Sequence, residues 1–216
     1  MLNQSDTAID ARAVSRNSND LGQGDGRVRV ARLSFLQDQE IFPQEVPATR
    51  LYRVLSGAVR TVRLLCDGRR QIGAFHFPGD WFGLSADGAH RFGAEAVSDA
   101  VVEAYPRSVL TLGGAAGPCA GPENAIVLQL ARAEDHLLLL GRKTAEERVA
   151  AFLCDLNARG IRELPMRRQD IADYLGLTIE TVSRMLSHLQ RSGLVEIAHS
   201  RSLRILKEDA LSTLAA

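Results

Sequence analysis

Residues 28 to about 110 carry short apolar runs separated by turn-forming residues. The runs include LYRVL, AVRTVRLL, RQIGAFHF and AEAV, and the turn formers include Ser56-Gly57, Asp67-Gly68 and Pro78-Gly79-Asp80. Closely spaced short strands with such turns are typical of a compact antiparallel barrel or sandwich. The pattern predicts an all-β domain over residues 28–121. Residues 1–27 are rich in Asn, Ser, Asp and Gly, which predicts a disordered tail.

A leucine-rich segment follows the Gly- and Pro-rich stretch 113–122 and predicts a helix over residues 122–144. Five of its residues are spaced 4, 3, 4 and 3 apart, and they are Ile126, Leu130, Ala133, Leu137 and Leu140. This is the a/d repeat of a two-stranded coiled coil, so we expect the helix to pair with a second copy of the chain. The alternative is a single buried helix in a monomer, with the off-stripe residues Val127, Leu128, Leu138 and Leu139 covering the barrel.

Residues 164–197 have the pattern of a helix, a tight turn, a second helix and a strand. An amphipathic stretch, 144–158, precedes them. Gly176 permits the sharp turn, and Thr178 is a good N-cap for the second helix. The apolar residues that pack the two helices together are Ile171, Ala172, Leu175, Val182, Met185, Leu186 and Leu189. The pattern predicts a helix-turn-helix within residues 145–216.

The outer face of the second helix carries polar side chains that share one stripe. They are Glu180, Ser183, Arg184, Ser187 and Arg191, at positions i, i+3, i+4, i+7 and i+11. A recognition helix places such N-terminal residues against base edges in the major groove. Arg184 can donate to guanine O6 and N7, Glu180 can accept from cytosine N4, and Ser183 can approach a base edge or a thymine methyl. The alternative is a solvated helix face with an i, i+4 Glu–Arg pair.

Beyond Gly193 the runs LVEI and LRIL flank the polar residues 198–202 and predict a β-hairpin, the wing of a winged helix-turn-helix. Several polar residues around the two helices are candidates for contacts with DNA phosphates, which give affinity without base specificity. They are Arg167, Arg168, Gln169, Thr178, Thr181, Ser187, Arg201 and Arg204. For each of them a solvated surface role is the alternative.

Composition limits the remaining function classes. The chain of 216 residues has 26 basic and 26 acidic residues, but residues 159–207 hold nine basic against five acidic side chains, as expected for a DNA-contacting module.

Cys66, Cys119 and Cys154 lie far apart without metal-ligand spacing, which indicates a reducing cytoplasm. No phosphate-binding Gly-rich loop or nucleophile elbow is present, so we expect no enzyme. No signal sequence or membrane span is predicted.

The chain resembles the CRP/FNR family of bacterial transcription regulators over about residues 28–210. The most specific segments are LLLLGRKTAEERVAAFL (137–153) and RRQDIADYLGLTIETVSRML (167–186). The resemblance implies a β-roll similar to a cyclic-nucleotide-binding domain, a homodimer on a palindromic DNA operator and contact with RNA polymerase. The E-x-x-S-R pattern at Glu180, Ser183 and Arg184, with Ile179, resembles the FNR and FixK branch, which favours TTGAT-type half-sites.

The same resemblance bears on the effector. Leu84 stands where the family's ribose-binding Glu is expected, and bulky Phe92 follows Arg91, so we predict that cyclic AMP is not the effector. Residues 1–65 contain no cysteine, so no iron–sulfur cluster is expected there. The remaining match is the cluster-free FixK-like group, which regulates low-oxygen respiration, denitrification and nitrogen fixation and is often controlled by the amount of protein made. We expect this chain to be an activator.

No cofactor is predicted from these residues. A haem-dependent sensor of nitric oxide is the alternative, with His76, His90 and His136 as conceivable axial ligands. Direct thiol control is disfavoured because the recognition helix carries Ser183 and no cysteine, and because Cys154 is expected to pack as a small apolar group.

Overall fold

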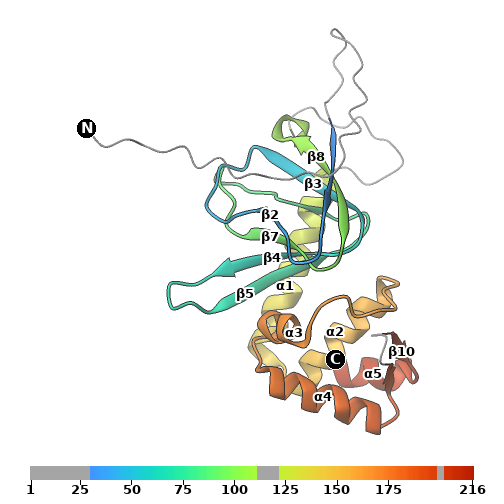
Figure 1. The fold of residues 1–216 in the computed structure, drawn as a ribbon. Coiled ribbons are helices and arrows are strands. Elements are labelled where there is room, and N and C mark those ends of the chain that lie inside the picture. The colour runs from blue at the N-terminus through green and yellow to red at the C-terminus, as the bar shows by residue number, and fades with distance from the viewer. Residues whose placement is uncertain (1–29, 111–121, 199–201) are drawn as a thin grey trace.

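The computed structural model describes residues 30–110, 122–198 and 202–216. The tail predicted for residues 1–27, most of the Gly- and Pro-rich stretch and Arg201 lie outside them. A β domain occupies the upper part of Figure 1, and a helical domain with a small hairpin occupies the lower part. Helix α1 (Pro122–Arg142) runs along the β domain and leads into the helical one.

The β domain is a roll of two four-stranded antiparallel sheets. One sheet has the order β1-β8-β3-β6 and the other the order β2-β7-β4-β5. The strands are β1 (Ala31–Phe35), β2 (Glu40–Phe42), β3 (Arg50–Ser56), β4 (Val59–Leu64), β5 (Arg70–His76), β6 (Trp81–Phe82), β7 (Gly93–Ala96) and β8 (Ala100–Pro106). Buried apolar side chains such as Val54, Val59 and Phe82 fill the space between the sheets. A short 3-10 helix, η1 (Arg107–Leu110), follows β8.

The turn between β3 and β4 requires glycine. Gly57 has a φ of 78°, and a Cβ atom there would lie 2.2 Å from the carbonyl oxygen of Asp99. The sequence Ser56-Gly57 therefore fixes the turn by which the chain passes from one sheet of the roll to the other, as the turn pattern predicts.

The helical domain is a winged helix-turn-helix, so the predicted fold class is confirmed. Its elements are α2 (Ala145–Ala158), α3 (Arg168–Leu175), α4 (Ile179–Arg191), β9 (Val195–Ile197), β10 (Leu203–Ile205) and α5 (Glu208–Ala215). Helix α2 begins at a capping box in which the Thr144 hydroxyl accepts from Glu147 N–H and the Glu147 carboxylate accepts from Thr144 N–H. The sequence patterns did not indicate α5, which packs on α2 through the fully buried Leu211.

One continuous apolar core joins the two domains. Ile72 and Phe75 of β5 belong to the same buried cluster as the inner faces of α2, α3 and α4. The ring of Phe75 lies 5.3 Å from that of Tyr174 on α3. Helix α3 is thus packed between β5 on one side and α4 on the other (Figure 1).

Candidate nucleic-acid interface

Gly176 makes the sharp turn between α3 and α4. It adopts the left-handed conformation, with a φ of 62° and a ψ of 39°, and its N–H donates to Ala172 O. Thr178 then caps α4, because its hydroxyl oxygen accepts from Thr181 N–H at 3.2 Å. Val182, Leu186 and Leu189 are buried against the rest of the domain. The local sequence therefore builds the helix-turn-helix as predicted.

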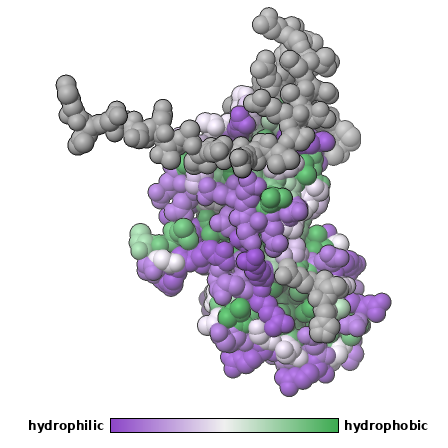
Figure 2. Space-filling model, in the orientation of Figure 1, coloured by the Kyte–Doolittle hydropathy of each residue, from purple (hydrophilic) through white to green (hydrophobic). Residues whose placement is uncertain are grey.

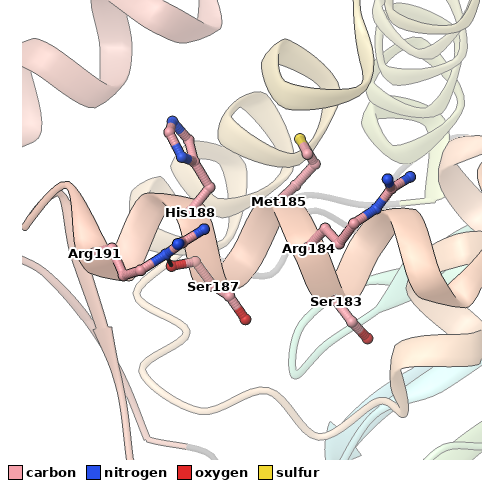
Figure 3. A pocket seen from close by; sticks show the side chains of 6 residues that line it. All are labelled: Ser183, Arg184, Met185, Ser187, His188 and Arg191. Carbon is pink, nitrogen blue, oxygen red and sulfur yellow. Dashed lines mark hydrogen bonds between the residues drawn. The ribbon is translucent and has the colours of Figure 1, made fainter.

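The opposite face of α4 is open to solvent. Glu180, Arg184, Ser187 and Arg191 are exposed, and Ser183 is half-buried. Figure 3 shows Ser183, Arg184, Ser187 and Arg191, with Met185 and His188, projecting from this one helix around a shallow depression. In Figure 2 the lower end of the molecule, over α4, is mainly hydrophilic. A duplex could approach this face without displacing any other described part of the chain.

Short side-chain contacts hold the polar stripe in place. Arg168 on α3 donates to the Ser183 hydroxyl at 3.2 Å, and Arg184 donates to the Thr181 hydroxyl at 3.4 Å. The pKa of Glu180 is lowered, first by a backbone hydrogen bond and then by the Thr178 hydroxyl and the charge of Arg184. Glu180 is therefore ionised at neutral pH and can only accept hydrogen bonds.

The candidate phosphate contacts occupy several different environments. Arg167 reaches the β-roll and pairs with Asp38 at 2.6 Å, whereas Gln169 donates to Asp173 within α3 at 2.7 Å. Arg204 is exposed on the wing and lies 3.7 Å from Glu196. Arg168 of α3 and Thr181 of α4 each contact the polar stripe, through Ser183 and Arg184 respectively.

The predicted a/d positions of α1 form a seam that consists of Ile126, Leu130, Ala133, Leu137 and Leu140. This seam is exposed along most of its length. The exposed fractions of Ile126, Leu130 and Leu137 are 47%, 60% and 71%, and Ala133 is exposed as well. Leu140 is only half-exposed, and its side chain would lie 3.5 Å from a Cβ atom at Gly176. The exposed apolar strip therefore covers the first four seam positions, whereas Leu140 faces the turn of the helix-turn-helix.

The apolar residues of α1 outside the seam also include both exposed and partly buried side chains. Val127, Leu128 and Leu138 are exposed at 69%, 48% and 61%, whereas Leu139 is partly buried against the shared core. The alternative of a helix fully covered within one chain does not describe this helix, because most of its apolar side chains have no covering group in the described residues.

A cavity of about 1290 Å³ lies between the β-roll, α1 and the helical domain. Leu84, Arg91 and Phe92 line it. The Phe92 ring packs closely on Gly73 of β5, where an added Cβ atom would lie 2.8 Å from Cε1 of the ring. His76, His90 and His136 line the same cavity. Nε2 of His76 and both ring nitrogens of His136 are buried without a hydrogen-bond partner. Within the described part of the chain, no cluster of three or more His, Cys, Asp or Glu side chains could hold a metal.

Sequence reasoning missed a set of ion pairs that joins the two domains. Arg60 on β4 and Arg70 on β5 both donate to the buried carboxylate of Asp170 on α3, and Arg70 also pairs with Asp173. Burial alone would lower the pKa of Arg70, but its hydrogen bond to Asp173 and the charge of Asp170 outweigh burial and raise it. The partners are about a hundred residues apart, so no local pattern could have revealed them.

A β-roll joined by a long helix to a winged helix-turn-helix with an open recognition face defines a DNA-binding transcription regulator. None of the helices among the described residues has the length and apolar character needed to cross a membrane. Residues 147–214 match the Crp-like helix-turn-helix domain, and residues 32–111 match the cyclic nucleotide-binding domain.

The comparisons with individual proteins are more specific. The chain is 47% identical to the nitrogen fixation regulation protein FixK of Azorhizobium caulinodans, over 83% of this chain and 77% of that protein. The FixK protein of Rhizobium meliloti is 44% identical, over 82% of this chain and 83% of its own length. The solved structure of FixK2 from Bradyrhizobium japonicum aligns with a TM-score of 0.79 and 44% identity, covering 87% of this chain and 98% of that one.

The chain therefore belongs to the CRP/FNR family, and FixK proteins are among its similar relatives. These relatives confirm the predicted family and branch, and they confirm that the chain is a transcription regulator and not an enzyme.

Proposed function

We propose that the chain acts as a homodimer that binds an inverted repeat of TTGAT-like half-sites and activates genes of nitrogen fixation and low-oxygen metabolism. The observation that carries the proposal is the polar stripe on the second helix of a helix-turn-helix, in which Glu180 and Arg184 are exposed and flank the half-buried Ser183. The physiological part of the proposal is supported by the similarity to FixK proteins, which are named as regulators of nitrogen fixation.

The residue roles follow from hydrogen-bonding capacity. The Arg184 guanidinium would donate to O6 and N7 of the guanine in the half-site, and the ionised Glu180 would accept from N4 of the paired cytosine. Ser183, held by Arg168, would lie against the neighbouring base edge or thymine methyl. Arg168, Gln169, Thr178, Thr181, Ser187 and the wing residue Arg201 would contact the phosphates, which fixes the register on DNA.

The dimer would form through the exposed strip on α1. Ile126, Leu130, Ala133 and Leu137 would pack against the same residues of a second copy, which covers apolar surface that one chain leaves in water. Two recognition helices would then enter successive major grooves about 34–36 Å apart, which is why the operator is an inverted repeat. The bound dimer would contact RNA polymerase in the cytoplasm, where the chromosome is.

Fluorescence anisotropy at fixed salt tests the proposal. The protein is titrated onto a duplex carrying TTGAT-N4-ATCAA and onto a scrambled duplex. Arg184→Ala is compared with Arg63→Ala, which removes the same side chain from an exposed position on β4. We expect tight binding that is lost on scrambling and with Arg184→Ala but kept with Arg63→Ala. Equal weak binding of the wild-type protein to both duplexes would contradict the proposal.

A second candidate function is DNA binding that depends on a small molecule, haem included, held in the cavity beside the β-roll. The favouring observation is that His76 and His136, which carry buried ring nitrogens without a hydrogen-bond partner, line a cavity large enough for such a ligand. The visible absorbance spectrum of the purified protein, and operator binding before and after removal of small molecules under denaturing conditions and refolding, distinguish the two functions. Operator binding that survives this treatment supports the effector-independent regulator.

A further inference from the structure

Four ion pairs attach the first helix of the helix-turn-helix to the β-roll. Asp170 lies between Arg60 Nη1 at 3.1 Å and Arg70 Nη2 at 2.7 Å, and Asp173 lies 2.8 Å from Arg70. At the start of α3, Arg167 pairs with Asp38 of the turn between β1 and β2. We call these residues, Asp38, Arg60, Arg70, Arg167, Asp170 and Asp173, the interdomain clamp.

The clamp fixes the orientation of α3 on the β-roll because its central residues are buried and their polar groups are hydrogen-bonded. The side chains of Arg60 and Asp170 are exposed to only 6% and 2%. The Arg60 guanidinium is further held by Glu95 and Asp38, at 2.7 and 3.1 Å. Asp170 also accepts from Arg167 N–H at 3.1 Å, so the carboxylate that caps α3 is the one that binds the β-roll. A planar guanidinium in such a network permits only one orientation of its partner.

On the β-roll side of the clamp, Asp38 adopts an unfavourable backbone conformation. Its φ is 63°, a left-handed conformation that a non-glycine residue adopts rarely, although Asp is among the more tolerant types. The backbone is fixed there by Asp38 N–H, which donates to Ala96 O at 2.8 Å. This turn places the Asp38 carboxylate between Arg60 and Arg167.

The apolar contacts between the domains do not supply this direction. The rings of Phe75, Phe152 and Tyr174 pack together at centroid distances of 5.3 to 6.1 Å, and burial of apolar surface is not directional. The ion pairs act on α3, which shares its buried face with α4. Whatever fixes the angle of α3 on the β-roll therefore fixes the angle of the recognition helix, whose outer face stays free.

We propose that Arg70 and Asp170 are positioning residues for DNA recognition, because the interdomain clamp sets the angle at which α4 is presented and hence the half-site spacing that the dimer accepts. The proposal rests on the proposed function, in which two α4 helices read an inverted repeat. When only the bonds of Arg70 are lost, we expect each recognition helix still to read its half-site. What is lost is the fixed geometry between the two helices.

The test compares two neighbouring arginines that differ in their partners. Arg70→Gln removes the bonds to Asp170 and Asp173, whereas Arg69→Gln makes the same charge change at an exposed residue whose side chain pairs with Asp67 of the same turn. Both variants are titrated onto duplexes carrying TTGAT half-sites separated by two to six base pairs. They are also titrated onto a duplex with a single half-site, and circular dichroism confirms that both are folded.

We expect Arg69→Gln to match the wild-type protein, with one preferred spacing. Arg70→Gln should lose roughly fivefold or more in affinity at the preferred spacing, the lower end of typical coupling between sites, and should bind the neighbouring spacings almost equally well. Binding to the single half-site should be unchanged. Arg70→Lys, which keeps the charge but not the planar fork, should give an intermediate spacing profile.

The outcomes separate the two proposals. If the wild-type protein does not distinguish the TTGAT repeat from a scrambled duplex, the proposed function fails. If it does, but Arg70→Gln keeps the same spacing profile as Arg69→Gln, the clamp does not position the recognition helix. A uniform loss of affinity by Arg70→Gln on every duplex, single half-site included, would also overturn the positioning role, because it would indicate damage to the helix-turn-helix itself.

Discussion

Arg60 and Asp170 are 110 residues apart in the chain, yet Nη1 of the arginine donates to the carboxylate at 3.1 Å in a site from which water is almost excluded. Buried ion pairs of this kind contribute little net stability compared with an apolar pair, but breaking one leaves an uncompensated charge. Each domain therefore supplies the charge that the other domain needs in its buried site, so the stability of the protein depends on the correct placement of the two domains.

Arg60→Met should destabilise the protein strongly for this reason. We expect a loss of about 3 kcal/mol in the free energy of unfolding, the lower end for a broken buried pair, because Arg70 still neutralises part of the Asp170 charge. Urea denaturation at pH 7.5 measures the change. Arg63→Met, on the exposed side of the same strand, is the control and should leave stability within about 0.5 kcal/mol. Equal midpoints for the two variants would contradict the expectation.

The recognition helix could be predicted in detail because its signals are local. The spacing of Val182, Leu186 and Leu189 defines the buried side of α4, and the same helical period puts Glu180 and Arg184 on the other side. Gly176 and Thr178 mark the turn and the cap by their chemistry alone. For these elements the tertiary structure adds no competing interaction.

Other features depend on which residues meet in space. Leu140 satisfies the heptad spacing, but it packs toward Gly176, because α1 ends against the helical domain. Arg167 looks like a free cation in sequence, yet it pairs with Asp38, which is 129 residues away. Helix α5 has a short amphipathic pattern whose partner, α2, is some fifty residues earlier. Spacing within a segment carries no information about such long-range partners.

Gly176→Ala should cost about 1–2 kcal/mol of stability, the usual penalty for a left-handed non-glycine residue. The nearest side-chain atoms to a new Cβ are Leu140 Cδ2 at 3.5 Å and Arg148 Nη1 at 3.7 Å, so the loss comes from backbone strain and not from a clash. Thermal unfolding measures it. Gly141→Ala, within α1 and with no atom near its Cβ, should instead stabilise the protein slightly. A neutral Gly176→Ala would show that the turn relaxes.

The buried His76 should make the protein less stable in mild acid. Burial lowers its pKa to about 4, with Asp80 opposing the shift and Arg159 and Arg132 adding to it. Because the folded pKa lies below the unfolded value, the unfolded chain takes up the proton first, and stability falls as the pH drops from about 6.5 towards 4. We expect this residue to account for a loss of about 2 kcal/mol between pH 7.5 and pH 5.

Urea denaturation at the two pH values, for the wild-type protein and His76→Leu, measures that contribution. The variant has no titrating group at this position, so its stability should fall less over the same interval. If His76→Leu loses as much stability as the wild-type protein, the acid sensitivity comes from other groups.

Leu137→Glu should weaken the proposed dimer. Leu137 is 71% exposed on α1, and a carboxylate there would be buried without a partner once two strips pack together. We expect the dimer to weaken by about 2 kcal/mol or more, which is over tenfold in the dissociation constant. Sedimentation velocity measures it. Leu64→Glu, at an exposed leucine of the β-roll, should leave the dimer intact. A Leu137→Glu protein that remains dimeric would place the interface elsewhere.

Glu180→Ala should weaken discrimination at the G·C pair without removing the electrostatic part of DNA binding. Changing the G·C pair of each TTGAT half-site to A·T should cost the wild-type protein about 1–3 kcal/mol per half-site, because Glu180 and Arg184 then lose their donors and acceptors. In Glu180→Ala that penalty should shrink, whereas the dependence of affinity on salt should hold, since a base-contacting carboxylate neutralises no phosphate. Anisotropy on the two duplexes at several salt concentrations measures both quantities.

Glu196→Ala removes an exposed carboxylate on the wing, so it is the matched control and should retain the full discrimination. If Glu180→Ala discriminates as well as this control, the cytosine is read by another group, and the role assigned to the first turn of α4 is wrong.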